Sequence, residues 1–194
     1  MNPYVVIDIG GTSIKYGLAD AEGQLIETHE MPTEAQKGGP HILKTTKEIV
    51  ARYLKKHALA GVAISSAGMV DPDKGEIFYA GPQIPNYAGT QFKKEIEEAF
   101  QLPCEIENDV NCAGLAEVTT GHAIGSNNAV CLTIGTGIGG CLLLDGQVFH
   151  GFSNSACEVG YLHLPDGAFQ DLASTTALVE YLSLIHISEP TRRR

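Results

Sequence analysis

The chain of 194 residues has no tryptophan and few basic residues. Thirteen Lys and Arg stand against 23 Asp and Glu, which gives a formal net charge of −10. A chain this acidic offers no basic patch that could dominate its field, so a nucleic-acid partner is not expected. There is also no run of about 18 apolar residues and no basic leader at the start, so neither a membrane partner nor export is expected.

Cysteine is present without a pattern. The five cysteines are odd in number and include no C-x-x-C pair, so the sequence encodes neither a disulfide framework nor a thiolate zinc site. Reduced thiols, and with them a cytoplasmic protein, are the expectation. With 43% hydrophobic and 19% charged residues the composition is that of a globular protein, and its length allows one large domain or two small ones.

The first part of the chain alternates strand and helix patterns. Three β-rich runs at 4–9, 13–19 and 24–30 are separated by turn-forming residues, which predicts three adjacent antiparallel strands. A helix follows, whose face with Ile42, Thr46, Ile49, Val50 and Tyr53 is expected to be buried. After it we predict a strand at 62–66 and a long loop over 65–91 with a hairpin near 76–79. The last elements predicted for this part are a helix at 92–100, a strand at 104–107 and a helix at 110–118. We therefore predict a βββαβαβα domain over residues 1–122.

A second domain is predicted from residue 123. The segment 121–128 has turn-forming residues and no periodicity, and strand patterns resume at 129–134, 140–144 and 147–149. A helix is expected to begin near Leu172. Both domains place a glycine-rich turn between two strands, which suggests a duplicated architecture.

Residues 182–194 do not continue the pattern that precedes them. They look like a translated transposon end from a sequencing library, and we expect them to be an artefact that ends the natural sequence after about Tyr181. On this interpretation, residues 123–181 are only the start of the second lobe. The truncated chain is then expected to be inactive and poorly soluble.

The first glycine turn lies within residues 7–15, Ile-Asp-Ile-Gly-Gly-Thr-Ser-Ile-Lys. Gly10 and Gly11 would let backbone N–H groups approach a phosphate, Thr12 adds a hydroxyl donor, and Asp8 could hold Mg²⁺ through water. The pattern lacks G-x-x-x-x-G-K-[ST] and continues as a strand, so it is not a Walker loop. Taken alone, a plain hairpin explains these residues equally well.

The second glycine turn lies within residues 132–140, Leu-Thr-Ile-Gly-Thr-Gly-Ile-Gly-Gly. Gly135, Gly137 and Gly140 satisfy G-x-G-x-x-G, but a strand follows where a dinucleotide-binding fold needs a helix. The Rossmann interpretation therefore fails on context. The density of glycines favours a phosphate site formed by backbone amides and Thr136 over a simple tight turn.

Four motifs, in this order, resemble those of the ROK family, which contains bacterial sugar kinases and sugar-responsive repressors. They are residues 8–15, the Asn-Asp-Val-Asn-Cys-Ala segment from Asn108, the turn at 135–140, and Ala-Cys-Glu-Val-Gly at 156–160. The resemblance covers residues 4–181. It implies an α/β protein with the two-lobed, RNase-H-like actin/hexokinase (ASKHA) fold, its second lobe incomplete here, in which a small-molecule sugar meets ATP and Mg²⁺.

The resemblance also implies roles for individual residues. Asp109 would contact the sugar and accept the proton of its hydroxyl, although Asn-Asp at a helix start is also a favoured N-cap. The other implied sugar ligands are Asn86, Asn108, Glu158 and Tyr161. The implied ATP ligands are Asp8, Gly10, Gly11, Thr12 and Lys15 at the first turn and Thr136, Gly137 and Gly139 at the second.

The sequence departs from the family pattern in three places. The usual His after Glu-x-Gly is Tyr161, the family's Glu beside its last cysteine aligns with Gln170, and the cysteine-rich zinc segment is absent. One nearby histidine, His163, cannot form a tetrahedral site without thiolates, so no structural zinc is expected. Because the changed positions resemble sugar contacts, the chain looks more like kinases of β-glucosides or N-acetylmannosamine than like glucokinases.

These observations predict a kinase that transfers the γ-phosphate of ATP to a hexose or hexose derivative at O6. Family members are commonly dimers, so the resemblance also makes a homodimer possible for the full-length protein. A sugar-responsive regulator is disfavoured, since the first strand already begins at Tyr4 with no recognition helix before it. A sugar-binding protein or inactive fragment without kinase activity stays open as an alternative.

Overall fold

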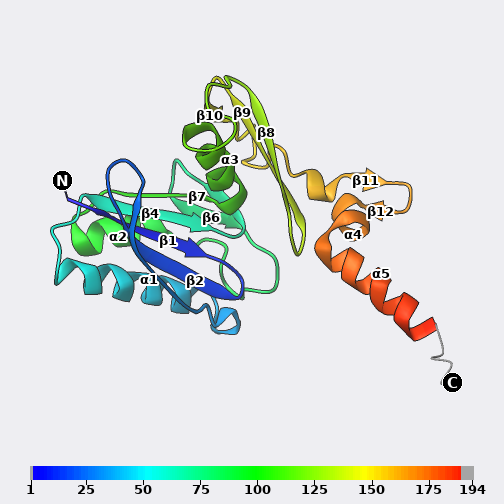
Figure 1. The fold of residues 1–194 in the computed structure, drawn as a ribbon. Coiled ribbons are helices and arrows are strands. Elements are labelled where there is room, and N and C mark those ends of the chain that lie inside the picture. Colours follow the sequence, from blue (N-terminus) through cyan, green and yellow to red (C-terminus); the bar gives the residue numbers. More distant parts are fainter. Residues whose placement is uncertain (1, 189–194) are drawn as a thin grey trace, which may run out of the picture. The chain divides into compact units, whose positions relative to one another are not determined.

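The computed structural model describes residues 2–188, and the chain divides into two compact units, Met1–Cys112 and Ala113–Arg194 (Figure 1). The division falls within α3 (Asp109–Thr119), earlier than the expected boundary after residue 122. Gly114 explains this, because a Cβ at that position would lie 2.5 Å from Cys141 Sγ, so the helix already packs on the second unit. No helix among the described residues is long and apolar enough to cross a bilayer.

The first unit is built on a five-stranded sheet with the strand order β3-β2-β1-β4-β7 (Figure 1). The three predicted antiparallel strands are confirmed as β1 (Tyr4–Ile9), β2 (Ser13–Ala19) and β3 (Leu25–Pro32). Beside β1 lies β4 (Gly61–Ser66), and beside β4 lies β7 (Cys104–Asn108), both in parallel pairing. Parallel strands end at the same sheet edge, which gathers their last residues there.

Two helices bury one face of this sheet, α1 (Gly39–Leu54) and α2 (Phe92–Phe100). All five α1 residues expected to be buried are buried, and the four apolar or aromatic ones share one hydrophobic cluster with Val5, Ile7 and Ile9 of β1. The predicted hairpin is also present, with β5 (Met69–Asp71) paired to β6 (Glu76–Tyr79). The sheet is therefore a packed platform for the residues at its edge.

The second unit opens with an antiparallel sheet in the order β10-β9-β8, as the strand patterns predict. After it the chain forms short elements and one longer helix, α5 (Thr175–Ser188), which runs past the expected end of the natural sequence at Tyr181. Part of the predicted tail, residues 189–194, lies outside the described residues. The elements of this unit are β8 (Ala129–Ile134), β9 (Ile138–Leu144), β10 (Gln147–Val148), η2 (Val159–Tyr161), β11 (His163–Leu164), β12 (Gly167–Ala168), α4 (Phe169–Ala173) and α5.

Candidate active site

A row of polar residues crosses the first sheet near the ends of its parallel strands. Asp8 of β1 is in register with Lys15 of β2 and with Ser65 of β4, and Ser65 is in register with Glu107 of β7. Because side chains alternate along a strand, this row lies on the face opposite Val5, Ile7 and Ile9. Ser65 Oγ donates a hydrogen bond of 2.8 Å to Asp8 Oδ1, which fixes the orientation of the Asp8 carboxylate.

The first glycine turn is held by Thr33, which directly follows β3. Its Oγ1 donates to the Gly10 carbonyl at 2.7 Å, and its N–H donates to the Thr12 carbonyl at 3.0 Å. A Cβ added at Gly11 would meet no atom within 4 Å, so this backbone faces open space and can be approached closely by a ligand. Thr33 was not predicted as part of the site, because no sequence motif marks it.

Asn108 and Asp109 lie side by side where β7 passes into α3. Asn108 Oδ1 accepts hydrogen bonds from the N–H groups of Val110 and Asn111, at 2.9 Å and 3.2 Å, so Asn108 caps the helix. Its Nδ2 donates to the Gly68 carbonyl at 2.9 Å and to Asp109 Oδ1 at 3.0 Å. Asn108 thus joins the end of β7 to the loop after β4 and orients the Asp109 carboxylate.

The pKa of the Asp109 carboxyl is raised above its ordinary value of 3.8, chiefly because surrounding protein atoms remove part of its hydration. Hydrogen bonds from the Val110 N–H and from Asn108 act in the opposite direction, and the negative charge of Asp8 raises the pKa further. A raised pKa makes a carboxylate a stronger base, which is the property that proton abstraction requires.

The expected sugar loop, residues 85–89, is anchored through Tyr87. The Tyr87 hydroxyl lies 2.7 Å from Ser66 Oγ at the end of β4, and its ring meets Phe92 edge-on with the centroids 6.0 Å apart. Tyr87 is buried, whereas Asn86 beside it is exposed and has a positive φ of 52°. Asn86 was predicted as a site residue, whereas Tyr87, the tyrosine that anchors its loop, was not.

The start of α1 packs against the same loop. Gly39 N–H donates to the Pro85 carbonyl at 2.9 Å, and a Cβ at Gly39 would lie 2.2 Å from the Asn86 carbonyl oxygen. Only a glycine permits this approach of two backbones. The loop that presents Asn86 is therefore fixed from two sides, by α1 and by β4.

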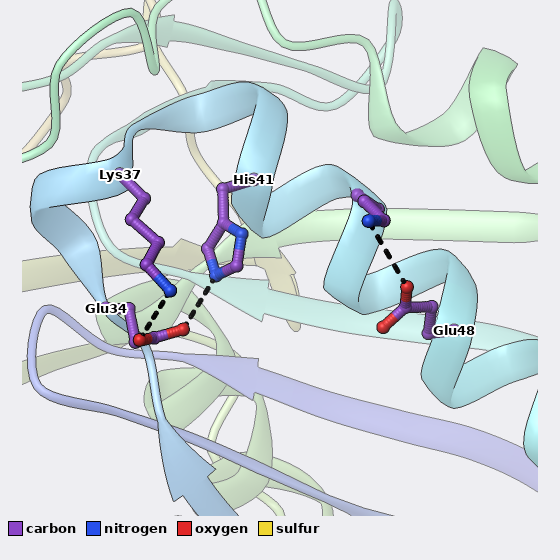
Figure 2. A network of polar contacts seen from close by, with 5 residues as sticks. Glu34, Lys37, His41 and Glu48 are labelled. Carbon is purple, nitrogen blue, oxygen red and sulfur yellow. Dashed lines mark hydrogen bonds and ion pairs between the residues drawn. The ribbon is translucent and has the colours of Figure 1, made fainter.

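An ionic network braces the chain just before α1. The Glu34 carboxylate lies 2.6 Å from Lys37 Nζ and 3.1 Å from His41 Nε2, and one turn further on Lys44 faces Glu48 at 3.8 Å (Figure 2). The hydrogen bond from Lys37 is the main cause that lowers the pKa of Glu34. The network joins the short helix η1 (Ala35–Lys37) to the first turn of α1.

In the second unit, the glycine turn between β8 and β9 is joined to the start of α5. Gly135 N–H donates to the Gly137 carbonyl at 2.9 Å within the turn. Thr175 N–H donates to the Gly135 carbonyl at 2.9 Å, and Thr176 Oγ1 donates to the Thr136 carbonyl at 2.9 Å. Thr136 and Gly137, the expected phosphate ligands, therefore lie in a turn that is hydrogen-bonded to the N-terminal end of α5.

Two of the glycines that the sequence analysis counted with this turn belong to β9, which begins at Ile138 instead of residue 140. A Cβ at Gly140 would lie 2.3 Å from the Cys157 carbonyl oxygen, so close packing explains this glycine. Gly139 pairs with Thr133 across the two strands. The density of glycines therefore has two causes, a turn and a tight contact.

The remaining expected sugar ligands flank η2. Glu158 is half-buried directly before it, and Tyr161 is exposed at its end. Gln170 of α4 lies next to both motifs, because its Oε1 would be 2.9 Å from a Cβ at Gly137 and 3.0 Å from a Cβ at Gly160. The position that departs from the family pattern thus contacts the glycine turn and the Glu158 segment together.

No cluster of three or more His, Cys, Asp or Glu side chains in residues 2–188 is arranged to hold a metal ion. His163 lies exposed in β11, apart from any such group. The absence of structural zinc stays a prediction, which metal analysis of the purified protein tests: about one equivalent of zinc would contradict it.

The order of strands, the polar edge with Asp8 and Asn108-Asp109, and the second glycine turn define a protein of the ASKHA fold class, the fold of actin and hexokinase. The chain belongs to the ROK family, whose profile matches residues 4–174. This confirms the resemblance based on the four sequence motifs.

Known proteins support this assignment along most of the chain. An uncharacterised protein of Clostridium perfringens is 51% identical over 98% of this chain and 65% of its own length. A glucokinase of Halalkalibacterium halodurans is 32% identical over 84% of this chain and 51% of its own length. The structure of a ROK glucokinase from Streptomyces griseus with glucose and AMPPNP has a TM-score of 0.82 at 29% identity, covering 97% of this chain and 62% of that one. The chain spans about half to two thirds of the length of these relatives.

Proposed function

We propose that this chain holds the sugar-binding and phosphate-binding residues of a kinase that transfers the γ-phosphate of ATP to O6 of a hexose or hexose derivative. The proposal depends above all on Asp109, a carboxyl of raised pKa that Asn108 orients at the edge where β1, β4 and β7 end. The glucokinases among its relatives support sugar phosphorylation in general.

Asp109 acts as the general base. As the sugar O6 forms its bond to the γ-phosphorus, the O6 proton moves to the Asp109 carboxylate, and the bond between the γ-phosphorus and the β,γ-bridging oxygen breaks to release ADP. Asn108 orients the Asp109 carboxylate through the hydrogen bond that its Nδ2 donates. The Asn108 amide is itself held in place, because its Oδ1 accepts a hydrogen bond from the Val110 N–H at the start of α3. Positioning of this kind avoids reorganisation when charge develops.

Residues at the two glycine turns bind the phosphates. In the first unit these are Thr12, Lys15 and the backbone of Gly10 and Gly11, and in the second unit Thr136 and the backbone of Gly137. Gly139, which lies in β9, has a backbone committed to strand pairing and is the weakest member of this proposed set. Asp8, whose carboxylate is oriented by Ser65, offers the oxygen ligands that Mg²⁺ prefers, and a Mg²⁺ ion held there would neutralise charge on the phosphoryl oxygens.

Each unit carries proposed sugar ligands with hydroxyl-recognising groups, Asn86 and Asn108 in the first and Glu158 and Tyr161 in the second. Carboxylate and amide groups pair well with sugar hydroxyls, because a carboxylate accepts hydrogen bonds from hydroxyl groups and an amide both accepts and donates them. Tyr161 stands where glucokinases of the family have a histidine, so we include β-glucosides and N-acetylmannosamine among the candidate sugars.

The test is sugar-dependent ADP release with glucose, N-acetylmannosamine or cellobiose. It is made on residues 1–181 joined to the C-terminal third of the Clostridium perfringens relative, with the 194-residue chain beside it and the Asp109→Asn variant of the chimera as the blank. Release with one sugar, absent from the blank, is the expected result. If the folded chimera binds ATP and still releases no ADP with any sugar, the kinase proposal is wrong and a sugar-binding or regulatory role replaces it.

A further inference from the structure

Two cysteines stand directly opposite each other in the sheet of the second unit. Cys131 and Cys141 are register partners in the antiparallel pair of β8 and β9, and both carry thiols. Side chains of opposite residues share one face of a sheet with their Cβ atoms about 4.5 to 5.5 Å apart. Here that face packs on α3, because a Cβ at Gly114 would lie 2.5 Å from Cys141 Sγ. The two sulfur atoms are therefore neighbours on the inner face of the hairpin.

The backbone shows which kind of cross-strand pair this is. Phe149 N–H donates to the Leu142 carbonyl at 2.8 Å, so the backbone groups of Leu142 point toward β10. Those of Cys141, one residue earlier, point toward β8, which makes Cys131 and Cys141 a hydrogen-bonded pair. The Cα atoms of such a pair are about 5.5 Å apart, within the range that a disulfide spans. The Cβ atoms must approach each other to about 3.8 Å, and a disulfide formed at this cost is one that thiols reduce again.

We propose that Cys131 and Cys141 form a thiol modification site, at which hydrogen peroxide converts the pair into a reversible cross-strand disulfide. Cys131 reacts first, because it is partly exposed whereas Cys141 is buried. Its sulfur attacks one peroxide oxygen and the O–O bond breaks, which leaves a sulfenic acid on Cys131 and one water. The Cys141 sulfur then attacks the Cys131 sulfur, the S–S bond forms, and the leaving hydroxide takes the Cys141 proton as a second water. The two thiols thus lose two electrons to one peroxide.

The other three cysteines are poor competitors for this reaction. Loss of hydration on burial raises the pKa of the Cys104 and Cys112 thiols to about 12, and it raises the pKa of Cys157 as well, so their reactive thiolate forms are scarce. Cys157 also lies across the sheet from the pair. Its Sγ would be 2.9 Å from a Cβ at Gly140, and successive residues of a strand face opposite sides.

The disulfide would close a covalent ring that contains the second glycine turn. Thr136 lies midway between the two cysteines in the sequence, and the strands on either side of it could then no longer separate. Exchange of protected amide hydrogens requires such local opening, so oxidation should slow exchange in residues 132–140. This inference depends on the register of the hairpin and not on the kinase proposal.

The test exposes the dilute 194-residue chain to a small excess of hydrogen peroxide and counts the remaining thiols. We expect the count to fall from five to three per chain, without a covalent dimer, and to return to five after dithiothreitol. The intact mass should fall by about 2 Da, as for one disulfide. Cys131→Ser should keep its four thiols, whereas the matched control Cys157→Ser, partly exposed on the other face, should fall from four to two.

A second variant, Cys141→Ala, guards against a misfolded Cys131→Ser chain and should likewise keep its four thiols. Loss of two thiols in either of these variants overturns the assignment of the pair. So does a parent chain whose thiols survive, whose disulfide only joins two chains, or whose Cys131 stops at a sulfenic or sulfinic acid. A fully oxidised chain in which residues 132–140 exchange as fast as in the reduced chain overturns the restraint on the turn.

Discussion

At the scale of single residues, Asn108 and Asp109 illustrate how adjacent polar side chains acquire different tasks. Either residue type can cap a helix, and the sequence alone does not say which of the two does so. In the structure Asn108 Oδ1 accepts hydrogen bonds from the Val110 and Asn111 N–H groups, and Asp109 Oδ1 shares only the Val110 N–H. Asn108 is thus the main cap of α3, and the proposed base is the residue beside it.

Asp109→Asn should abolish turnover while sugar binding survives. Asn keeps an oxygen for the hydrogen bonds from Asn108 and Val110 but cannot accept a proton, and loss of a general base lowers rates by about 10² to 10⁴. The measurement is ADP release by the chimera together with calorimetric sugar titration. Activity within a factor of a few of the parent would remove Asp109 from the mechanism and leave it as a polar neighbour of the cap.

The same substitution should show a pH-dependent gain in stability. Because the pKa of Asp109 is raised in the folded state, the folded chain holds this proton more tightly than the unfolded chain, and stability falls as the pH rises from about 3.8 through the raised pKa. Asparagine does not titrate, so the Tm of Asp109→Asn minus that of the parent should increase between pH 4 and pH 7. Melting curves across this range test it, and a constant difference would contradict the raised pKa.

Gly11→Ala should separate folding from nucleotide binding. A Cβ at Gly11 meets no atom within 4 Å, so the change should alter the free energy of unfolding by no more than about 0.5 kcal/mol. The added methyl group would nevertheless occupy the space where a phosphate approaches the backbone, and ATP affinity should fall about tenfold or more. Unchanged ATP affinity in the folded variant would argue that the first turn is a plain hairpin.

At the scale of elements, the loop at 85–89 depends on Tyr87 for its position. Tyr87→Phe removes the hydroxyl that lies 2.7 Å from Ser66 Oγ, and the lost buried hydrogen bond should cost about 0.5 to 1.5 kcal/mol in the free energy of unfolding. If the loop presents Asn86 to the sugar, KM for the sugar should rise more than kcat falls. Arg52→Gln, a partner of the Tyr16 hydroxyl elsewhere in the unit, serves as the control and should leave KM unchanged.

The ion pairs of Glu34 with Lys37 and His41 contribute little to stability. Their side chains are between about a quarter and a half exposed, and exposed ion pairs contribute little because water and salt screen them. The close contact of Gly39 with the Asn86 carbonyl fixes the same segment through backbone packing, which no salt concentration alters. We conclude that glycine packing positions the start of α1 and that the ions only brace it.

Much of the secondary structure could be predicted because local patterns and burial agree in the first unit. The strands β1 and β2 and the helix α2 match their predicted bounds, and the α1 face is buried as its periodicity requires. The contacts that hold the site could not be predicted, since Thr33, Ser65 and Tyr87 reach their partners across 23, 57 and 21 residues of sequence. Such contacts are set by tertiary structure and leave no local periodicity.

At the scale of the whole molecule, the hydrophobic core is distributed unevenly. Among the described residues, the fully packed cluster that includes β1, β4, α1 and α2 lies in the first unit, and the buried apolar residues of the second unit are Ile138, Cys141 and Leu143. Apolar burial is the main stabilising term in folding. We therefore regard the first unit as the stable scaffold and the second as the part whose stability is marginal in this chain.

This uneven core leads to a prediction about β8, an edge strand of its sheet in the described part of the chain. Its alternate residues Val130, Leu132 and Ile134 are 62%, 49% and 64% exposed, and an exposed apolar edge strand is a template for pairing with another chain. We expect the 194-residue chain to associate with itself as its concentration rises, which sedimentation velocity would show as a growing sedimentation coefficient.

Charges placed on this strand should suppress the association. Val130→Lys with Ile134→Lys introduces two ammonium groups whose mutual repulsion between chains opposes edge pairing. The matched control is Ile26→Lys on β3, also an edge strand with an exposed apolar residue but already carrying Glu27 and Glu30 beside it, and it should leave the association unchanged. Equal suppression by both variants would mean that a lysine on either exposed edge strand suppresses the association, so that the β8 edge is not its particular site.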